Sequence, residues 1–277
     1  MNKIQSATTR PLNAVWLSDI HLGYKGCRAE FVLDFLNKNP AKVIYLVGDV
    51  IDFWALKRQF MWPESHHAVI KKLLALAASG TRVVYIPGNH DDHCRDLCAQ
   101  VLLNIEIHRE IIHRTAEGKR LLVVHGDEFD HAVRCNRLHK LAGNIGYDLL
   151  LFVNRWSNRI RGWMGLPYWS LAYYIKNRVT NAMVAIRSFE NAAAAEARRR
   201  NLDGIVCGHI HQPEIRTIDG VLYCNDGDWI ESCTALVERN TGRLELIHWG
   251  DLQQAVKCDQ AANDDKLRPL RLPSLVS

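Results

Sequence analysis

The chain has 277 residues, of which 48% are hydrophobic, so it is long enough to bury one large core or two small ones. Its formal net charge of +5 gives no reason to expect a nucleic-acid partner, and its eight cysteines, without a Cys-x-x-Cys pair, argue against a disulfide scaffold. The first residues lack an apolar signal core, and no run of about 18 apolar residues follows, so we expect a protein of the reducing cytoplasm.

The first 130 residues alternate apolar strands with amphipathic helices. In chain order, the predicted elements are strand 14–19, helix 28–38, strand 42–49, helix 63–79, strand 81–89 and helix 92–103. Pro63 opens the second helix and Gly80 closes it, as these residue types commonly do. This βαβαβ order predicts a parallel sheet with helices packed on its faces.

Hairpin patterns replace the strand–helix alternation after residue 104. Antiparallel strand pairs with glycine-containing turns are predicted over 105–127, 214–225 and 234–249. The core of the protein is therefore expected to comprise 12–130 and 201–250. Residues 1–11 and 251–277 have the composition of loose tails.

Residues 131–200 differ from the rest of the chain and are helical by pattern. They carry twelve Lys or Arg against three Asp or Glu, a balance of +9 that leaves −4 for the remainder. One interpretation is a helical subdomain with a solvated basic face. The other is a cap that grips an anionic, partly apolar substrate, with Arg155, Arg159 and Arg161 as the substrate-binding residues. Tryptophans beside these arginines would also suit an anionic membrane surface.

Polar side chains of metal-binding type follow every strand that leads into the core. The pieces, each at the end of an apolar strand, are SDIHLG, VGDVIDFW, PGNHDD, VVHGD and CGHIHQP. Because sites in open α/β sheets form outside the carboxyl ends of the strands, we expect these side chains to meet at one rim. The candidates are Asp19, His21, Asp49, Asn89, His90, Asp91, His125, His209 and His211.

Carboxylates, an amide oxygen and imidazoles are ligands that Mn²⁺, Fe²⁺ or Zn²⁺ accept, and the lack of cysteine among them disfavours a structural zinc site. The set without His90 and Asp91 is too large for one ion, so we predict two divalent ions that share a carboxylate. Two ions about 3.5–4 Å apart form a clamp for in-line displacement at phosphorus. Any one of these pieces alone would be read as a chance turn; five together are not explained by chance.

The ordered set of motifs, spanning 18–213, resembles the calcineurin-like metallophosphoesterase superfamily. The resemblance implies an α/β fold, a four-layer α/β/β/α sandwich with a helical cap inserted at 131–200. It implies one ion held by Asp19, His21, Asp49 and His211, and another held by Asp49, Asn89, His125 and His209, with Asp49 bridging. His90 would stabilise transition-state charge or protonate the leaving oxygen, and Asp91 would orient or charge that histidine.

Within the superfamily, the LVGDVIDFW stretch, the helical insertion and the closing CGHIHQP look like the UDP-2,3-diacylglucosamine pyrophosphatases of lipid A biosynthesis. That likeness implies cleavage of UDP-2,3-diacylglucosamine, or a similar nucleotide-linked glycolipid, to UMP and a lipid phosphate. Mn²⁺ is the expected ion, with Fe²⁺ or Zn²⁺ as alternatives. The protein would be cytoplasmic, with peripheral contact at the inner membrane surface.

Two other functions stay open on the sequence. The lipid A pyrophosphatases commonly have arginine where this chain has His90, so a soluble phosphodiesterase or nucleotidase of the same superfamily is the first alternative. A metal-free binding scaffold is the second and more remote one, since such a protein would be expected to have lost ligands that this chain retains. The oligomeric state is left without a prediction.

Overall fold

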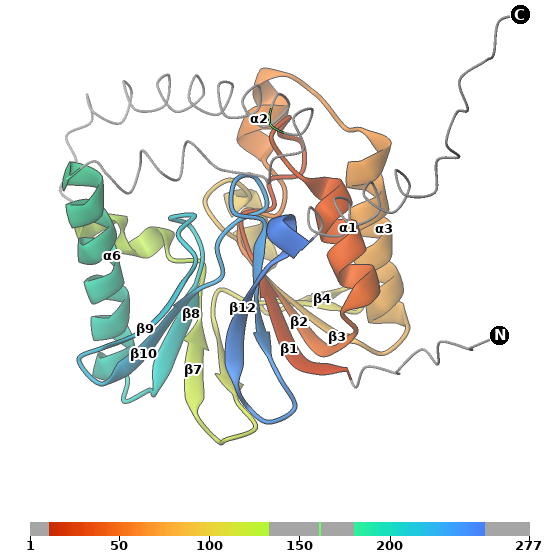
Figure 1. The fold of residues 1–277 in the computed structure, drawn as a ribbon. Coiled ribbons are helices and arrows are strands. Elements are labelled where there is room, and N and C mark those ends of the chain that lie inside the picture. Colours follow the sequence, from red (N-terminus) through yellow and green to blue (C-terminus); the bar gives the residue numbers. More distant parts are fainter. Residues whose placement is uncertain (1–10, 133–160, 162–179, 253–277) are drawn as a thin grey trace, which may run out of the picture.

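The computed structural model describes residues 11–132, 161 and 180–252, which form two β-sheets between helical layers (Figure 1). Among these residues the first sheet has seven strands, in the order β12-β11-β1-β2-β3-β5-β4, and the second has five, in the order β6-β7-β8-β10-β9. The first sheet contains β1 (Leu12–Leu17), β2 (Ala41–Val47), β3 (Arg82–Ile86), β4 (Val101–Leu102), β5 (Ile105–Ile107), β11 (Thr234–Glu238) and β12 (Leu244–His248). The second contains β6 (Ile111–Arg114), β7 (Arg120–Val123), β8 (Gly204–Cys207), β9 (Glu214–Ile218) and β10 (Val221–Asn225).

The parallel strands of both sheets end at a common rim. Strands β1, β2, β3 and β5 run parallel in the first sheet, as do β7, β8 and β10 in the second. A hydrogen bond joins the ends across the two sheets: His125, after β7, contacts the carbonyl oxygen of Val47 through Nδ1 at 2.9 Å. Within the second sheet, the carbonyl of His125 accepts from the N–H of Gly208, after β8. The chain therefore delivers the segments that follow these strands to one place.

Helices cover the outer faces of both sheets. Helices α1 (Ala29–Lys38) and α3 (Glu64–Ala78) lie on the first sheet, and α6 (Thr180–Arg199) lies along the second (Figure 1). Apolar side chains fill the space under each helical layer and between the sheets, where Trp16, Tyr45 and Val206 are fully or almost fully buried. The predicted four-layer α/β/β/α arrangement is confirmed. A short helix that the sequence did not suggest, α2 (Phe53–Arg58), stands at the rim.

Residues 92–103 do not form the predicted helix. They begin as a 3₁₀ helix, η1 (Asp92–Leu97), and end as the edge strand β4. Leu103 and Asn104 both adopt positive φ, 51° and 64°, which gives the tight turn that pairs β4 antiparallel with β5. The helix prediction is wrong at this point because strand pairing overrides the local apolar spacing.

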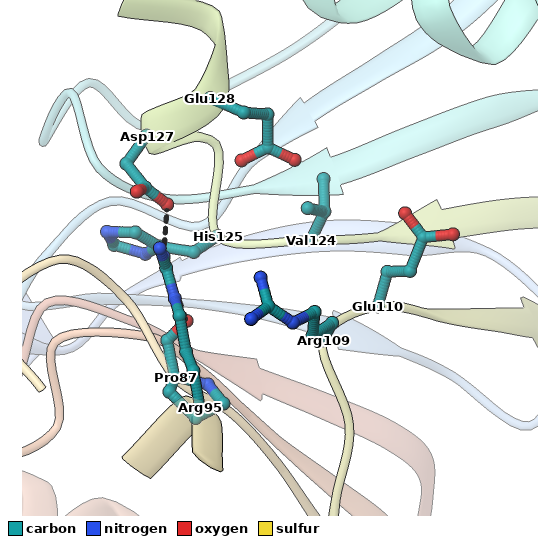
Figure 2. A pocket seen from close by; sticks show the side chains of 8 residues that line it. All are labelled: Pro87, Arg95, Arg109, Glu110, Val124, His125, Asp127 and Glu128. Atoms are coloured by element: carbon teal, nitrogen blue, oxygen red, sulfur yellow. Dashed lines mark hydrogen bonds and ion pairs between the residues drawn. The ribbon is translucent and has the colours of Figure 1, made fainter. Parts of the chain in front are cut away.

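The hairpin predicted over 105–127 is confirmed only in its second part. Strands β6 and β7 pair antiparallel, but β5 leaves the hairpin and joins the first sheet parallel to β3. A second 3₁₀ helix, η2 (Asp127–Ala132), follows β7, and the Arg95–Asp127 ion pair at 2.7 Å ties it to η1 (Figure 2). The two later hairpins, β9–β10 and β11–β12, are confirmed.

The range 131–200, predicted as an inserted cap, contains α6. This helix packs on the second sheet through Phe189, Ala193 and Ala197, so it forms the outer layer of the sandwich and not part of a cap. Most of the remaining range, like most of the two predicted tails, lies outside the described residues. In the part of the chain that the structure describes, no helix is both long enough and apolar enough to cross a membrane.

Candidate metal centre

The structure brings the strand-end side chains of both sheets together at the rim. Three groups of His and Asp side chains each place one ligand atom per residue within 4.8 Å of the others. These groups are Asp19–His21–His211, His21–Asp49–His90 and Asp49–His125–His209. Asp49 and His21 each belong to two groups, so the clusters form one continuous site.

Asp49 lies at the middle of the cluster. Its Oδ2 is 3.5 Å from His125 Nε2, 3.8 Å from His21 Nε2 and 4.0 Å from His90 Nε2. The other oxygen, Oδ1, accepts a hydrogen bond from the backbone N–H of His90 at 2.8 Å. One carboxylate thus faces imidazoles from both sheets while its orientation is fixed from the side.

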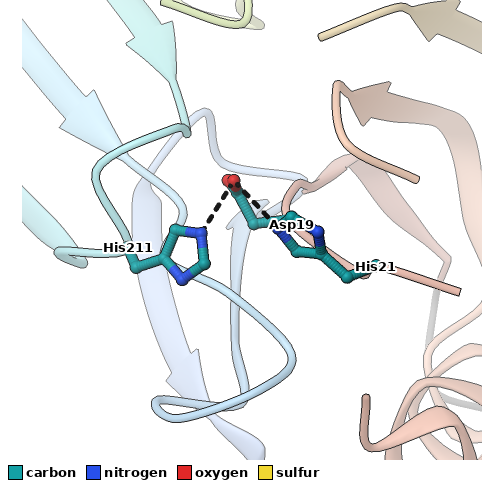
Figure 3. Close-up of side chains that lie close together, drawn as sticks. All are labelled: Asp19, His21 and His211. Atoms are coloured by element: carbon teal, nitrogen blue, oxygen red, sulfur yellow. Dashed lines mark ion pairs between the residues drawn. The ribbon is translucent and has the colours of Figure 1, made fainter. Parts of the chain in front are cut away.

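Asp19 and His211 make up the second side of the cluster (Figure 3). Asp19 Oδ1 lies 3.1 Å from His211 Nε2 and 3.8 Å from His21 Nε2, whereas Oδ2 accepts from the backbone N–H of His209 at 2.8 Å. Both Asp19 Oδ1 and His21 Nε2 are buried without a hydrogen-bond partner. Orphaned buried acceptors are costly, and a cation between them would satisfy both. The donor set therefore fits a divalent ion.

The remaining predicted ligands border the Asp49 side. Asn89 Oδ1 is 3.2 Å from His125 Nε2, and the rings of His125 and His209 stand 5.1 Å apart. His209 Nε2 contacts Asp130 Oδ1 at 2.9 Å. A carboxylate bound to the ring nitrogen that does not ligate the metal fixes the orientation of a ligating imidazole. The sequence analysis did not single out Asp130 for this role.

Five of the predicted ligands have left-handed backbone conformations. Their φ values are 50° for Asp19, 55° for His21, 51° for Asp49, 67° for His209 and 53° for His211. Residues other than glycine seldom adopt positive φ, and such conformations concentrate at functional sites. The sharp turns after β1, β2 and β8 aim these side chains at the rim instead of along the strands.

The backbone approaches the site so closely at two positions that only glycine can stand there. A Cβ on Gly48, which has φ of 81°, would lie 2.1 Å from His125 Nδ1. A Cβ on Gly88 would lie 2.3 Å from Asp49 Oδ1. Both contacts are far inside van der Waals distance, so these glycines set the spacing between Asp49 and His125.

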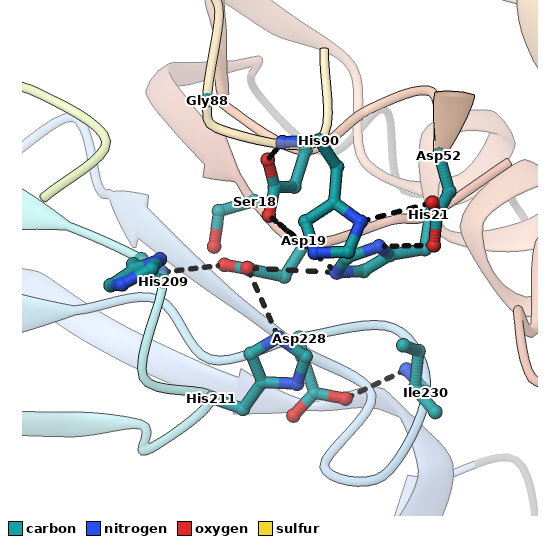
Figure 4. A network of polar contacts seen from close by, with 12 residues as sticks. Ser18, Asp19, His21, Asp52, Gly88, His90, His209, His211, Asp228 and Ile230 are labelled. Carbon is teal, nitrogen blue, oxygen red and sulfur yellow. Dashed lines mark hydrogen bonds and ion pairs between the residues drawn. The ribbon is translucent and has the colours of Figure 1, made fainter. Parts of the chain in front are cut away.

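Asp52 is a site residue that the sequence analysis missed (Figure 4). Its Oδ2 contacts His21 Nδ1 at 3.1 Å, and its Oδ1 contacts His90 Nδ1 at 2.9 Å. The same Oδ1 accepts from the backbone N–H of Ala55 and caps α2. One buried carboxylate therefore orients two imidazoles at once. Its place in the GDVID stretch, next to the first turn of a helix, was the available signal.

Asp91 does not orient His90, and that prediction is wrong. Its fully buried carboxylate accepts hydrogen bonds from the backbone N–H of Gly88 at 2.5 Å, of Asp49 at 3.2 Å and of Val50 at 2.8 Å. Two of these three donors belong to the loop that carries Asp49. Asp91 thus stabilises the turn after β2.

Replacement of Asp52 by Asn is expected to lower turnover by about 10- to 100-fold, the usual loss when the partner of a ligating histidine is removed. Asparagine also caps helices well, so α2 and the melting temperature should be little affected. Steady-state kinetics at saturating metal, together with a thermal melt, measure this. Asp92→Asn, at a side chain 49% exposed, is the matched control. Turnover within twofold of the unmodified protein would contradict the role given to Asp52.

His90 stands at the open edge of the cluster. Its side chain is 21% exposed, and the ring of Trp54 lies over it with 4.1 Å between centroids. Burial of one ring face and the bond to Asp52 leave Nε2 directed toward Asp49. A group bound at the centre of the cluster would therefore lie close to His90 Nε2.

Burial and neighbouring charges shift the pKa values of the histidines and aspartates in the cluster. Burial acts against protonation of His21, but the neighbouring carboxylates of Asp19 and Asp52 outweigh it and raise the pKa of His21 to about 10. Burial acts against ionisation of Asp49, but the positive charge of His125 outweighs it and holds the pKa of Asp49 below its usual range. Metal ligands bind in their deprotonated forms, so uptake of a cation at neutral pH would displace protons from these imidazoles.

Among the described residues, no contact is found between the site and the three predicted substrate-binding arginines. Arg155 and Arg159 lie outside the described part of the chain, and Arg161 is half-buried within a single described helical position. Their assignment stays a prediction.

Comparisons with known proteins agree with the site. The model of the calcineurin-like phosphoesterase family matches residues 12–213. A relative from Neisseria gonorrhoeae, named UDP-2,3-diacylglucosamine hydrolase, is 26% identical over 77% of this chain and 88% of its own length. One of the same name from Blochmanniella pennsylvanica is 24% identical over 75% and 82%. A solved E. coli phosphoesterase, Yfce, gives a TM-score of 0.42 at 16% identity, covering 85% of this chain and 98% of its own.

The family match covers most of the chain and includes all five strand-end motifs, from the turn after β1 to the one after β8. Those motifs supply the buried His and Asp clusters that could hold a metal ion. The chain therefore belongs to the calcineurin-like phosphoesterase family and is a metal-dependent phosphoesterase.

Proposed function

We propose that this protein is a two-metal hydrolase that cleaves the pyrophosphate of UDP-2,3-diacylglucosamine, or of a similar nucleotide-linked glycolipid, to UMP and a lipid phosphate. The observation that carries the proposal is the position of Asp49, which shares one ligand group with His21 and another with His125 and His209. The names of the curated relatives support the choice of substrate. Hydrolysis of a phosphate ester or anhydride is the chemistry that such a paired cation site performs best.

The proposal assigns the ligands as the sequence suggested. One ion would be held by Asp19, His21, Asp49 and His211. The second would be held by Asp49, Asn89, His125 and His209. Mn²⁺ suits this set of oxygen and imidazole donors, and Fe²⁺ or Zn²⁺ would also be accepted. When bound, the ions supply positive charge that polarises the phosphoryl group and lower the pKa of water at the site.

The side chains of this protein position the phosphoryl group and supply a proton to the leaving oxygen. Asp49 and Asp19 would hold a phosphoryl group indirectly, through the cations that they bind at the rim. His90, oriented by Asp52 through Nδ1, directs Nε2 toward the reacting group and gives its proton to the leaving oxygen. Phosphoryl transfer depends mainly on this positioning and charge stabilisation, with little covalent work for the protein.

The lipid half of the substrate calls for contacts outside the sandwich. In the proposal, Arg155, Arg159 and Arg161 of the inserted segment bind its phosphate, and the segment places the protein at the cytoplasmic face of the inner membrane. The basic balance of +9 over 131–200 favours both anionic lipid headgroups and anionic substrates.

Incubation of the purified full chain with Mn²⁺ and UDP-2,3-diacylglucosamine in detergent micelles is expected to release UMP, measured by chromatography. Bis(p-nitrophenyl) phosphate, assayed in parallel, reports the reaction class without the nucleotide or the lipid. Release of p-nitrophenol without release of UMP would reject the lipid substrate and favour the soluble phosphodiesterase. Neither product, in a chain that takes up no metal, would indicate a metal-free scaffold.

A further inference from the structure

A cavity of about 230 Å³ adjoins the candidate metal centre on the side of His125. Its walls come from the ends of β3 and β7, from η1 and η2, and from the connection between β5 and β6 (Figure 2). His125 belongs to both the metal centre and the cavity, because its ring contacts Asp49 and the residue also lines the cavity. The cavity therefore begins one side chain away from Asp49 in the candidate metal centre.

The charged side chains of the cavity are unequally paired. Arg95 and Asp127 form an ion pair with each other, and Glu110 is paired with Arg200, which directly follows α6. Arg109 makes no ion pair or hydrogen bond to any residue that the structure describes. Figure 2 shows Arg109 and Glu128 entering the same space from opposite sides. The cavity thus presents one strong donor group facing an acceptor group.

The balance of charge selects the class of ligand. Three carboxylates line the cavity beside two guanidinium groups and the ring of His125, so a phosphate would meet repulsion as well as attraction there. An acyl chain would bury the charged groups without replacing their hydrogen bonds to water, which is unfavourable. A neutral group that carries both hydrogen-bond donors and acceptors satisfies Arg109 and Glu128 together. The volume lies below the roughly 300 Å³ at which drug-sized pockets begin, so it suits a compact ring system.

We propose that this cavity binds the nucleoside half of the substrate. The proposal rests on the function proposed above in that it needs a nucleotide-linked phosphate at the metal centre. Arg109 donates to a carbonyl or ring oxygen of the nucleoside, and Glu128 accepts from a hydroxyl or from a ring N–H.

The test compares UMP with inorganic phosphate, because the two share the group held at the metal centre and differ by the nucleoside. Calorimetric titration of the Mn²⁺-loaded full chain gives both Kd values. In the unmodified protein, UMP is expected to bind at least about tenfold more tightly than phosphate, a difference of about 1.4 kcal/mol. Arg109→Ala is expected to bring the two Kd values within about threefold, and Glu128→Gln to narrow the gap in part.

Arg114→Ala is the matched control, since Arg114 is exposed on β6 and does not line the cavity. It should leave the ratio of the two Kd values unchanged. The proposal is overturned if UMP binds no more tightly than phosphate, or if Arg109→Ala keeps the original ratio. A ratio that collapses in Arg109→Ala, with no hydrolysis of UDP-2,3-diacylglucosamine, would keep the nucleoside cavity and reject only the glycolipid substrate.

Discussion

Asp49→Asn is expected to reduce phosphodiester turnover by about 10³-fold or more and to lower the bound metal below two ions per chain. Asp49 belongs to two of the three ligand groups, and Asn replaces its charge by a neutral amide. A paired metal site supplies several kcal/mol of charge stabilisation in the transition state, and each ~1.4 kcal/mol is a factor of ten in rate. Kinetics with bis(p-nitrophenyl) phosphate and metal analysis of the dialysed protein measure the two effects.

The matched control for this substitution is Asp219→Asn. Asp219 also has a positive φ, 48° against 51° for Asp49, and asparagine tolerates that conformation at both positions. Its side chain is 74% exposed in the turn between β9 and β10 and lies outside the candidate metal centre. Unchanged metal content and turnover in Asp49→Asn would show that this carboxylate does not bridge two ions.

His90→Gln is expected to reduce turnover by about 10²- to 10⁴-fold for substrates whose leaving oxygen needs a proton. The loss should be much smaller for bis(p-nitrophenyl) phosphate, because p-nitrophenolate leaves without protonation. Metal content should stay at two ions, since the proposed ligands do not include His90. A comparison of kcat for a poor and a good leaving group in the same variant measures the effect.

His93→Gln is the control for His90, because His93 has a side chain that is 66% exposed and contacts Lys57 at the surface. Equal losses for both leaving groups in His90→Gln would rule out proton donation. They would leave His90 as a residue that only stabilises charge in the transition state, the other role that the sequence suggested for it.

The composition of the candidate site could be predicted from sequence because of how the fold is built. Parallel strands bring their carboxyl ends to one rim, so a polar residue after each apolar strand has a defined destination. Asp19 and His209 are 190 positions apart in the chain, yet the backbone N–H of His209 binds Asp19 Oδ2. The strand patterns alone were sufficient to expect that meeting.

The pairing of residues within the site could not be predicted in the same way. Asp91 adjoins His90 in sequence, but the turn at Gly88 sends its carboxylate toward the backbone of Val50. Asp52 reaches His90 only because α2 begins directly at the rim. Which carboxylate serves which imidazole depends on the local backbone turns, and a spacing of residue types carries little information about them.

The same limit applies to the edge of the first sheet. Residues 92–103 have the composition of a helix, and they pair with β5 because a left-handed turn at Leu103 and Asn104 makes that pairing available. The helix α6 shows the converse case: its helical pattern was recognised, but the layer that it forms was not. Local patterns define elements, whereas the partner of each element is a property of the whole chain.

The measurement that tests the central claim most directly is the electron paramagnetic resonance spectrum of the Mn²⁺-loaded chain, taken with its metal content. Two ligand groups joined at Asp49 predict two ions per chain whose spins are coupled through the shared carboxylate. A spectrum of isolated ions, or a content of one ion or none after saturation, would contradict the account of a bridged pair.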